Sequence, residues 1–322
     1  MPTQFNSPVY ENDAPKVDAA SIIILRKAGA LILGKTTTTE FAATTQGPKT
    51  CNPHDPSRTP GGSSSGSGAA VGDFQAPIGL GTQTGGSTVR PGSFNGIYAF
   101  KPTWNSISRE GQKIYSLILD TLGLYARSVE DLELLADVFA LKDDQPPNPE
   151  FNIQGANIAF CKTMVWPQVG SGTAAAMTKA KQILESHGAK VSDIDLPESL
   201  DDFPKWHAAI MVSDGRTAFL PEYTFSKGKI SDELVGHVEN KTQLSRAAQL
   251  EAFDNIAAAR PVVDKILKQY DAVIVPSVPD EAPKGIDKTG SAAFNIIWTV
   301  SSHPSSIASA MGAPQDLNVN CF

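Results

Sequence analysis

Short apolar runs of strand length alternate along this chain with amphipathic stretches of helix length. The apolar runs predict strands at 30–34, 76–81, 96–103, 156–161, 190–196 and 272–276. The amphipathic stretches predict helices at 18–28, 129–141 and 173–187 and a mostly helical block at 200–269. Because strands that alternate with helices usually pair in parallel, the pattern predicts an α/β fold.

Capping and linker signals agree with these boundaries. Asp18 is a suitable N-cap for the first helix, Gly29 suits the position just after its end, and Ser128 suits the start of the helix at 129–141. The segment 142–149 is rich in Pro and Asp and has the composition of a linker. We expect the helical block at 200–269 to be an insertion that lies over one face of the sheet.

Composition narrows the class of protein. The chain has 322 residues, 41% of them hydrophobic, which suffices for a sizeable core. Its net charge of −7 comes from scattered acidic residues, so we expect no nucleic-acid partner. It has no apolar run of membrane-spanning length and no signal peptide, so we expect no membrane association and a cytoplasmic location. The three cysteines, Cys51, Cys161 and Cys321, are too few and too scattered for a disulfide framework or a zinc site.

Two glycine- and serine-rich segments, 60–72 and 79–91, hold the most unusual composition in the chain. Glycine lets the backbone approach a ligand closely, and serine supplies short hydroxyl groups. A flexible linker is the alternative interpretation. Linkers, however, lack an ordered apolar run such as 76–81 and rarely end in a fixed Arg-Pro. The two segments therefore favour a structured functional site.

The segment Thr84-Gly85-Gly86-Ser87 supplies the parts needed for nucleophilic catalysis. Ser87 offers a nucleophilic oxygen, and the successive backbone amides of Gly85, Gly86 and Ser87 are suited to bind an oxyanion. The segment is not a Gly-x-Ser-x-Gly nucleophile elbow, which disfavours an α/β-hydrolase. Among five histidines His54 is nearest in sequence, but its Pro- and Asp-rich loop favours a solvated histidine over a catalytic base.

A phosphate-binding loop is a further alternative, because Gly34-Lys35-Thr36 matches the end of that motif. The upstream glycine of the motif is missing, and here the helix precedes the strand. We therefore expect no nucleotide site and no cofactor.

Together these motifs resemble the amidase signature family. The residues that carry the resemblance are 34–36 with 40–42, Asn52-Pro53 with 58–62, the serine-rich runs 61–68 and 79–91, Gly96, 101–103, 120–123 and 126–129. The likeness is strong over 1–140 and persists beyond only as an overall pattern, as at 275–277 and 294–299. It implies one domain over 1–322, with a signature core at 1–140 and a less similar part at 150–322. It also implies a mixed, largely parallel twisted sheet covered by helices.

The resemblance implies hydrolysis of a small-molecule amide or ester by a Ser, cis-Ser, Lys triad. Ser87 matches the acylated nucleophile and Ser63 matches the bridging serine, whose peptide bond to Gly62 is expected to be cis. The backbone at Thr84, Gly85 and Gly86 matches the oxyanion loop, and Ser64 is expected to hydrogen-bond within the same network. We expect the side-chain oxygens of Ser63 and Ser87 to lie about 3 Å apart, because a helix and a return strand bring both segments to one sheet edge.

The sequence departs from the family pattern at the catalytic lysine. That lysine belongs to a Val-Lys-Asp-like segment upstream of the bridging serine, and the first residues here resemble the segment that follows it. Lys16, Lys27 and Lys35 precede the site, but none matches the catalytic position. We expect the chain to begin after its own base and to stop before the family's last strands, either as a truncated reading of the gene or as a true pseudoenzyme.

Three interpretations follow from this departure. The chain is an active amidase or related C–N hydrolase that compensates for the lysine, a catalytically silent relative that binds a carbonyl ligand, or a subunit resembling the amidotransferase that makes amidated tRNA. Neither the oligomeric state nor the substrate can be derived from these residues.

Overall fold

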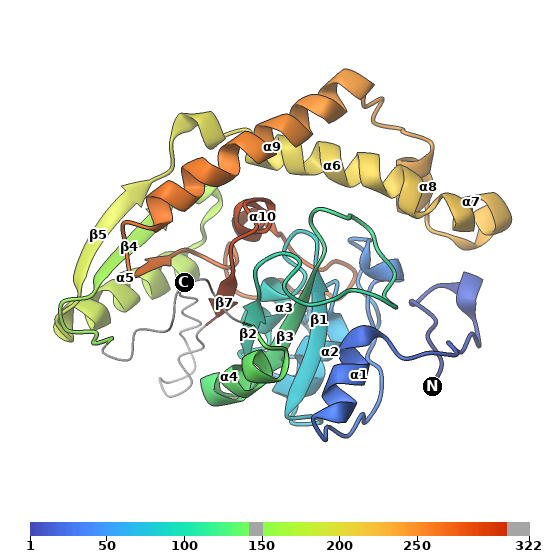
Figure 1. The fold of residues 1–322 in the computed structure, drawn as a ribbon, viewed down its shortest axis with the longest axis horizontal. Coiled ribbons are helices and arrows are strands. Elements are labelled where there is room, and N and C mark those ends of the chain that lie inside the picture. The colour runs from blue at the N-terminus through green and yellow to red at the C-terminus, as the bar shows by residue number, and fades with distance from the viewer. Residues whose placement is uncertain (142–150, 308–322) are drawn as a thin grey trace.

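The computed structural model describes residues 1–141 and 151–307, and the predicted linker at 142–149 lies outside this range. Two hydrogen-bonded sheets organise the described chain (Figure 1). The first has the order β1 (Ile78–Gln83), β3 (Thr121–Ala126), β2 (Tyr98–Lys101) and β7 (Ser305–Ile307). The second has the order β5 (Lys190–Asp195), β4 (Asn157–Lys162) and β6 (Ala272–Ile274).

The two sheets differ in strand direction. The second sheet is parallel throughout, whereas every ladder of the first is antiparallel. β1 and β2 both run antiparallel to β3, so they run in the same direction as each other. The α/β class is therefore confirmed, with parallel hydrogen bonding confined to the second sheet. The helix α3 (Val89–Phe94) connects β1 to β2, a connection typical of adjacent parallel strands. In this sheet, however, β3 lies between β1 and β2.

Helices surround both sheets and form a long outer layer. The α-helices are α1 (Ala20–Lys27), α2 (Ser65–Gly72), α3 (Val89–Phe94), α4 (Val129–Val138), α5 (Ser171–Ser186), α6 (Phe203–Ala218), α7 (Leu220–Ser226), α8 (Asp232–Val238), α9 (Arg246–Leu267) and α10 (Ala293–Val300). Short 3₁₀ helices occur at Pro8–Tyr10, Glu40–Ala42, Trp166–Gln168, Glu198–Leu200 and Lys227–Lys229. Figure 1 shows α6 and α9 side by side as a layer above the sheets, with α10 between this layer and the first sheet. No helix of the described ranges is long and apolar enough to cross a bilayer.

Local sequence signals explain several helix boundaries. The Ser128 hydroxyl accepts a hydrogen bond from the Asp131 N–H at 3.1 Å, so this serine caps α4 as predicted. The first helix also forms, with Gly29 at φ +92° just after its end. Asp18 is not its cap, because the helix begins later, at Ala20, and the Asp18 carboxylate instead pairs with Arg26 at 2.9 Å.

The predicted strand at 30–34 is wrong. The segment forms no β ladder with any described residue, and the side chains of Leu31 and Leu33 are 86% and 71% exposed. An apolar run becomes a buried strand only where neighbouring strands pair with it and cover it. The sequence pattern alone therefore overstated the burial of this segment.

The largest core cluster joins the outer layer to the sheets. Phe203 and Ile210 of α6 pack there with Ile256 and Val263 of α9 and with Ile297 of α10, all essentially buried. A separate cluster packs α2 and α3 against the first sheet. This packing fixes α6 and α10 above the end of β1, where the serine-rich segments meet.

Lys101 is buried at the end of β2 without a carboxylate partner among the described residues. Its ammonium donates hydrogen bonds to the carbonyls of Pro102 at 3.0 Å and His303 at 2.5 Å, and burial lowers its pKa to about 7. An unfolded lysine titrates near pH 10.4, so between these values the unfolded chain binds more protons and the free energy of unfolding rises with pH.

We therefore expect the wild type to gain about 2 kcal/mol of stability between pH 7 and 9 relative to Lys101→Met. Urea unfolding of both proteins at the two pH values measures this difference. Parallel pH profiles for the two proteins would show that Lys101 keeps an ordinary pKa.

Candidate active site

The predicted cis peptide bond is present between Gly62 and Ser63. It precedes α2, and Gly61 before it has φ +81°, a conformation that favours glycine. The Ser63 carbonyl accepts a hydrogen bond from the Thr39 N–H at 3.1 Å. The Gly62 carbonyl accepts two from the Arg90 guanidinium, at 2.6 and 3.2 Å. The backbone around Ser63 is thus held from both sides.

A helix and a strand lie between Ser63 and Ser87, in the order predicted. α2 leads into β1, and the Ser64 hydroxyl joins the start of this helix to the end of the strand through hydrogen bonds with the Thr82 N–H at 3.0 Å and carbonyl at 3.3 Å. Residues 84–87, which we call the 84–87 loop, then lead toward α3. Ser64 therefore has a structural role in joining the two segments.

The predicted hydrogen bond between Ser63 and Ser87 is not formed. The Ser63 hydroxyl is buried, the residue being 3% exposed, and has no hydrogen-bond partner among the described residues. Ser87 is half-buried. A buried hydroxyl without a partner costs about 1–3 kcal/mol, and Ser63 is one of several buried polar groups in the described ranges that the fold leaves without one.

Every carbonyl of the 84–87 loop is tied to a donor outside the loop. The Thr84 carbonyl accepts from His207 Nε2 at 3.0 Å, and the Gly85 carbonyl from the Thr299 hydroxyl at 2.6 Å. The Gly86 and Ser87 carbonyls accept from the Arg90 N–H at 2.9 Å and the Tyr125 hydroxyl at 3.2 Å.

The N–H groups of the same loop have no such partners. Those of Gly85, Gly86 and Ser87 donate to no acceptor in the described ranges, whereas the next two, of Thr88 and Val89, both donate to the Gln83 side chain at 3.0 Å. Successive unpaired N–H groups form an anion-binding nest. The loop therefore has the hydrogen-bonding pattern required to stabilise an oxyanion.

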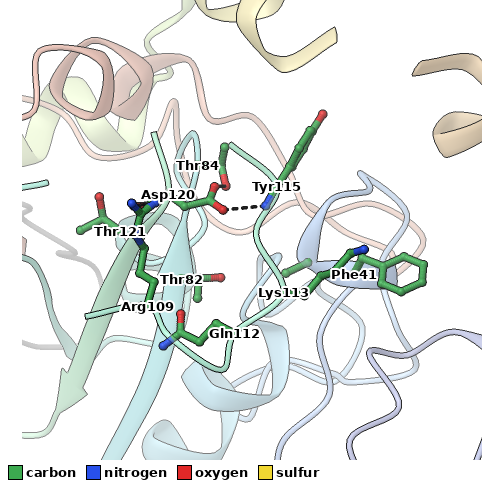
Figure 2. A pocket seen from close by; sticks show the side chains of 10 residues that line it. Phe41, Thr82, Thr84, Arg109, Gln112, Lys113, Tyr115, Asp120 and Thr121 are labelled. Atoms are coloured by element: carbon green, nitrogen blue, oxygen red, sulfur yellow. Dashed lines mark hydrogen bonds between the residues drawn. The ribbon is translucent and has the colours of Figure 1, made fainter. Parts of the chain in front are cut away.

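Asp120 orients Thr84 at the start of the loop. Its carboxylate accepts from the Thr84 hydroxyl at 2.6 Å and from the Tyr115 N–H at 2.7 Å, the latter drawn in Figure 2. Burial raises the pKa of the Asp120 carboxyl, and these hydrogen bonds oppose that effect.

A small pocket of about 20 Å³ opens beside Thr84, with room for about one water-sized group. Figure 2 shows Arg109, Lys113 and Gln112 at its walls. The Lys113 ammonium is paired with Glu222 at 2.7 Å. Arg109 donates to backbone carbonyls of the segment before β3, including that of Asp120 at 2.9 Å. The two cations are thus already occupied within the protein.

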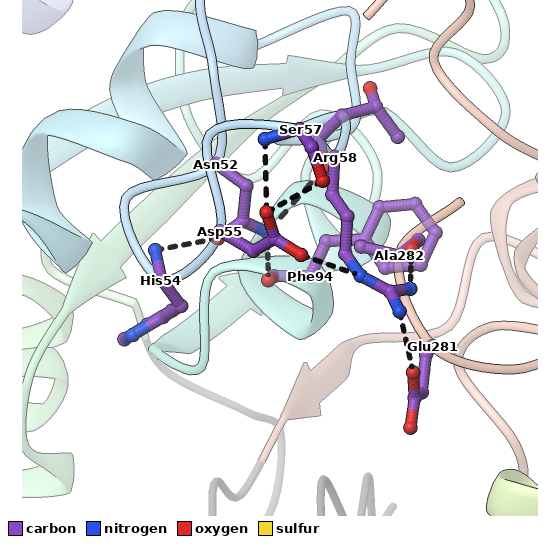
Figure 3. Close-up of polar contacts among 9 residues, drawn as sticks. Asn52, His54, Asp55, Ser57, Arg58, Phe94, Glu281 and Ala282 are labelled. Atoms are coloured by element: carbon purple, nitrogen blue, oxygen red, sulfur yellow. Dashed lines mark hydrogen bonds and ion pairs between the residues drawn. The ribbon is translucent and has the colours of Figure 1, made fainter. Parts of the chain in front are cut away.

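The other candidate bases lie in structural roles. His54 Nε2 hydrogen-bonds the Asn95 carbonyl at 2.9 Å, and the backbone N–H of His54 donates to the Asn52 side chain. An ion pair between Asp55 and Arg58 stabilises the same loop (Figure 3). Lys35 contacts the Thr3 hydroxyl, and none of the described lysines hydrogen-bonds Ser63. Across 1–141 and 151–307 no cluster of His, Cys, Asp and Glu is suited to hold a metal ion.

Sequence reasoning missed the residues that hold the 84–87 loop. In the sequence Arg90 and Asp120 are visible only as members of the family motifs, although the charge of Arg90 inside a glycine-rich run is a sign of buried hydrogen bonding. His207 and Thr299 lie more than a hundred residues further along the chain, and no local signal connects them to the loop.

The two glycines of the loop provide a matched test of its geometry. A Cβ on Gly86 would overlap Asn295 Oδ1 and lie 3.0 Å from Ala292 Cβ, whereas a Cβ on Gly85 would meet His207 Cε1 at 3.4 Å, an ordinary contact. We expect Gly86→Ala to slow acylation by p-nitrophenyl acetate about 10²-fold through displaced donors. Gly85→Ala should stay within about 5-fold of the wild type, and equal rates for the two variants would contradict this geometry.

Comparison with known proteins identifies the family. A family model described as Amidase matches residues 1–319, so the chain belongs to the amidase family. Among its relatives is a subunit of the glutamyl-tRNA(Gln) amidotransferase of Carboxydothermus hydrogenoformans, 35% identical over 222 residues that cover 64% of this chain and 46% of the relative. The corresponding chloroplastic/mitochondrial subunit of Zea mays is 30% identical over 88% of this chain and 61% of its own length. The chain thus spans about half the length of these relatives.

A solved structure gives the same result for the fold. The native peptide amidase from Stenotrophomonas maltophilia superposes with a TM-score of 0.76 and 25% identity, over 100% of this chain and 75% of that one. The α/β fold and membership of the amidase signature family, which the sequence predicted, are therefore confirmed.

Proposed function

We propose that this protein hydrolyses carboxylic amide or ester bonds through an acyl-enzyme formed on Ser87. The observation that carries the proposal is the pairing pattern of the 84–87 loop, in which each carbonyl is tied outward and the N–H groups of Gly85, Gly86 and Ser87 have no acceptor in the described ranges. Such donors, fixed before the substrate arrives, stabilise the charge that develops on a substrate oxygen during acyl transfer.

The reaction begins when Ser87 Oγ attacks the substrate carbonyl carbon. The hydroxyls of Ser87 and Ser63 are not hydrogen-bonded in the structure, so they must first approach each other before the proton passes to Ser63 Oγ. Ser63 then releases its own proton onward, while the substrate oxygen becomes an oxyanion against the loop N–H groups. The C–N or C–O bond then breaks, and the leaving nitrogen or oxygen departs with a proton. Water attacks the acyl group on Ser87, which releases the carboxylic acid and restores the serine.

The proton acceptor beyond Ser63 sets the rate. A positioned base is worth about 10²- to 10⁴-fold, and Ser63 has no hydrogen-bond partner among the described residues. With water or the leaving group as acceptor, we expect slow turnover, about 10³- to 10⁴-fold above the uncatalysed rate, to which Ser87, the Ser63 relay, the loop donors and substrate binding all contribute.

Two other functions remain as alternatives, each tied to an observation. The Ser63 hydroxyl, which has no partner in the described chain, also fits a silent protein that binds a carbonyl ligand at the loop. The likeness to glutamyl-tRNA(Gln) amidotransferase subunits favours a component of such an assembly, with a cytoplasmic or organellar location.

Trapping the acyl-enzyme tests the proposal. The protein is incubated with p-nitrophenyl acetate, quenched in acid and analysed by intact and peptide mass spectrometry. We expect one acetyl group on the peptide that contains Ser87. Acetylation only at other residues would exclude Ser87 as the nucleophile, and no acetylation together with binding of benzoate would support the silent carbonyl-binding protein.

A further inference from the structure

The outer helical layer reaches the 84–87 loop through one buried side chain. His207 lies on α6, 123 residues beyond Thr84 in sequence, and is 8% exposed. Its Nε2 lies 3.0 Å from the Thr84 carbonyl oxygen, and its ring lies over Gly85, where a Cβ would meet Cε1 at 3.4 Å and Nε2 at 3.5 Å. The proposed reaction assigns no step to this histidine.

The planar peptide bond links this contact to the direction of the Gly85 N–H. The Thr84 carbonyl and the Gly85 N–H belong to the same peptide unit and point in opposite directions when the bond is trans. The cis bond of the described chain lies elsewhere, between Gly62 and Ser63. Holding the carbonyl toward α6 therefore turns the Gly85 N–H to the opposite side, among the unpaired donors.

We propose that His207 is a positioning residue that keeps the Gly85 N–H directed at the oxyanion. The inference rests on the proposed function, because it names a further residue for the same site. Without the hydrogen bond from His207 to the Thr84 carbonyl, the peptide unit between Thr84 and Gly85 can rotate, since glycine tolerates both signs of φ. A rotated peptide places the Thr84 carbonyl oxygen where the donor stood, and an oxygen there repels the developing charge.

The imidazole is suited to donate through Nε2, and this nitrogen is then not available as a base. Burial lowers the pKa of His207, so the ring is neutral and carries one proton. A carbonyl oxygen only accepts hydrogen bonds, so that proton must lie on Nε2. Nε2 then has no lone pair with which to take a proton from Ser87.

Two substitutions separate donation from packing. His207→Gln keeps an N–H donor near the position of Nε2, whereas His207→Leu fills similar space without a donor. Losing one oxyanion donor costs about 10²- to 10³-fold, and a donor left mobile costs less. We expect His207→Leu to lower kcat for p-nitrophenyl acetate about 10- to 100-fold with KM within about 3-fold, and His207→Gln to restore kcat to within about 3-fold of the wild type.

A binding measurement keeps the test independent of turnover. Benzoate titrated into ¹⁵N-labelled protein should shift the Gly85 amide resonance of the wild type and of His207→Gln, but not that of His207→Leu. If the wild type binds benzoate at Gly85 and does not acylate Ser87, the proposed hydrolysis fails while the role of His207 is still tested by the shifts.

The outcomes that overturn the role of His207 are distinct. They are equal kcat and equal benzoate shifts for the Leu and Gln variants, a change in KM alone, or no shift at Gly85 in the wild type. If His207→Leu does not fold, His207→Asn replaces it, because its shorter amide falls short of the Thr84 carbonyl and should behave as the Leu variant does.

Discussion

Replacing Ser87 with alanine is expected to abolish acylation by p-nitrophenyl acetate, with a fall in rate of about 10³-fold or more. The nucleophilic oxygen is lost, and the remaining donors of the 84–87 loop cannot form an acyl-enzyme. The Ser87 side chain is half-buried and makes no hydrogen bond within the described part of the chain, so stability should change by less than about 0.5 kcal/mol. Stopped-flow release of p-nitrophenol measures the rate, and thermal unfolding measures the stability.

Ser63 and Ser65 provide the matched control for this prediction. Both are buried, but the Ser65 hydroxyl donates to the Gly61 carbonyl at 2.8 Å, whereas the Ser63 hydroxyl has no described partner. Ser63→Ala should slow acylation about 10²-fold or more at unchanged or higher stability, because it removes an unsatisfied buried group. Ser65→Ala should cost about 1–2 kcal/mol of stability. A Ser63→Ala protein that acylates at the wild-type rate would remove Ser63 from the mechanism.

The sequence predicted the local parts of the site because those parts are encoded locally. A run of glycines and serines allows a helix to start directly after the cis bond, and Gly66 lies so close to Thr37 that a Cβ would meet its backbone nitrogen at 2.6 Å. In the chain order of helix α2, strand β1 and helix α3, Ser63 comes just before α2 and Ser87 lies between β1 and α3. These features depend on residues within about thirty positions of each other.

The support of the site could not be predicted in the same way. His207, Thr299 and Asp120 reach the loop only because α6, α10 and the segment before β3 pack around it, and that packing is a property of the whole fold. The strand predicted at 30–34 failed for the related reason that apolar character does not specify a pairing partner. Long-range contacts, and not local pattern, decide both cases.

Arg90 joins the two serine-rich segments to the chain near residue 290. Its guanidinium donates to the Gly62 carbonyl at 2.6 and 3.2 Å, to the Gly290 carbonyl at 2.8 Å and to the Thr289 hydroxyl at 3.3 Å. The residue is 6% exposed, and burial lowers its pKa to about 10. No carboxylate pairs with it in the described ranges, so carbonyl and hydroxyl dipoles compensate its charge.

Arg90→Met is therefore expected to destabilise the protein by about 2–5 kcal/mol, because it leaves the buried Gly62 carbonyl and the half-buried Gly290 carbonyl without these donors. Arg127→Met is the matched control. Arg127 also donates to two carbonyls, those of Val71 at 3.2 Å and Ala76 at 2.7 Å, but it is only half-buried, so water can replace it at a cost of about 1 kcal/mol or less.

Urea unfolding of the wild type and both variants gives the two free energies. Arg90→Lys should lie between the wild type and Arg90→Met, since an ammonium is a single point donor and cannot span Gly62 and Gly290 as the planar guanidinium does. If Arg90→Met costs no more than Arg127→Met, the guanidinium is dispensable. The backbone at Gly62 would then be held by its packing against Thr289 and Ser65, the side chains nearest to it.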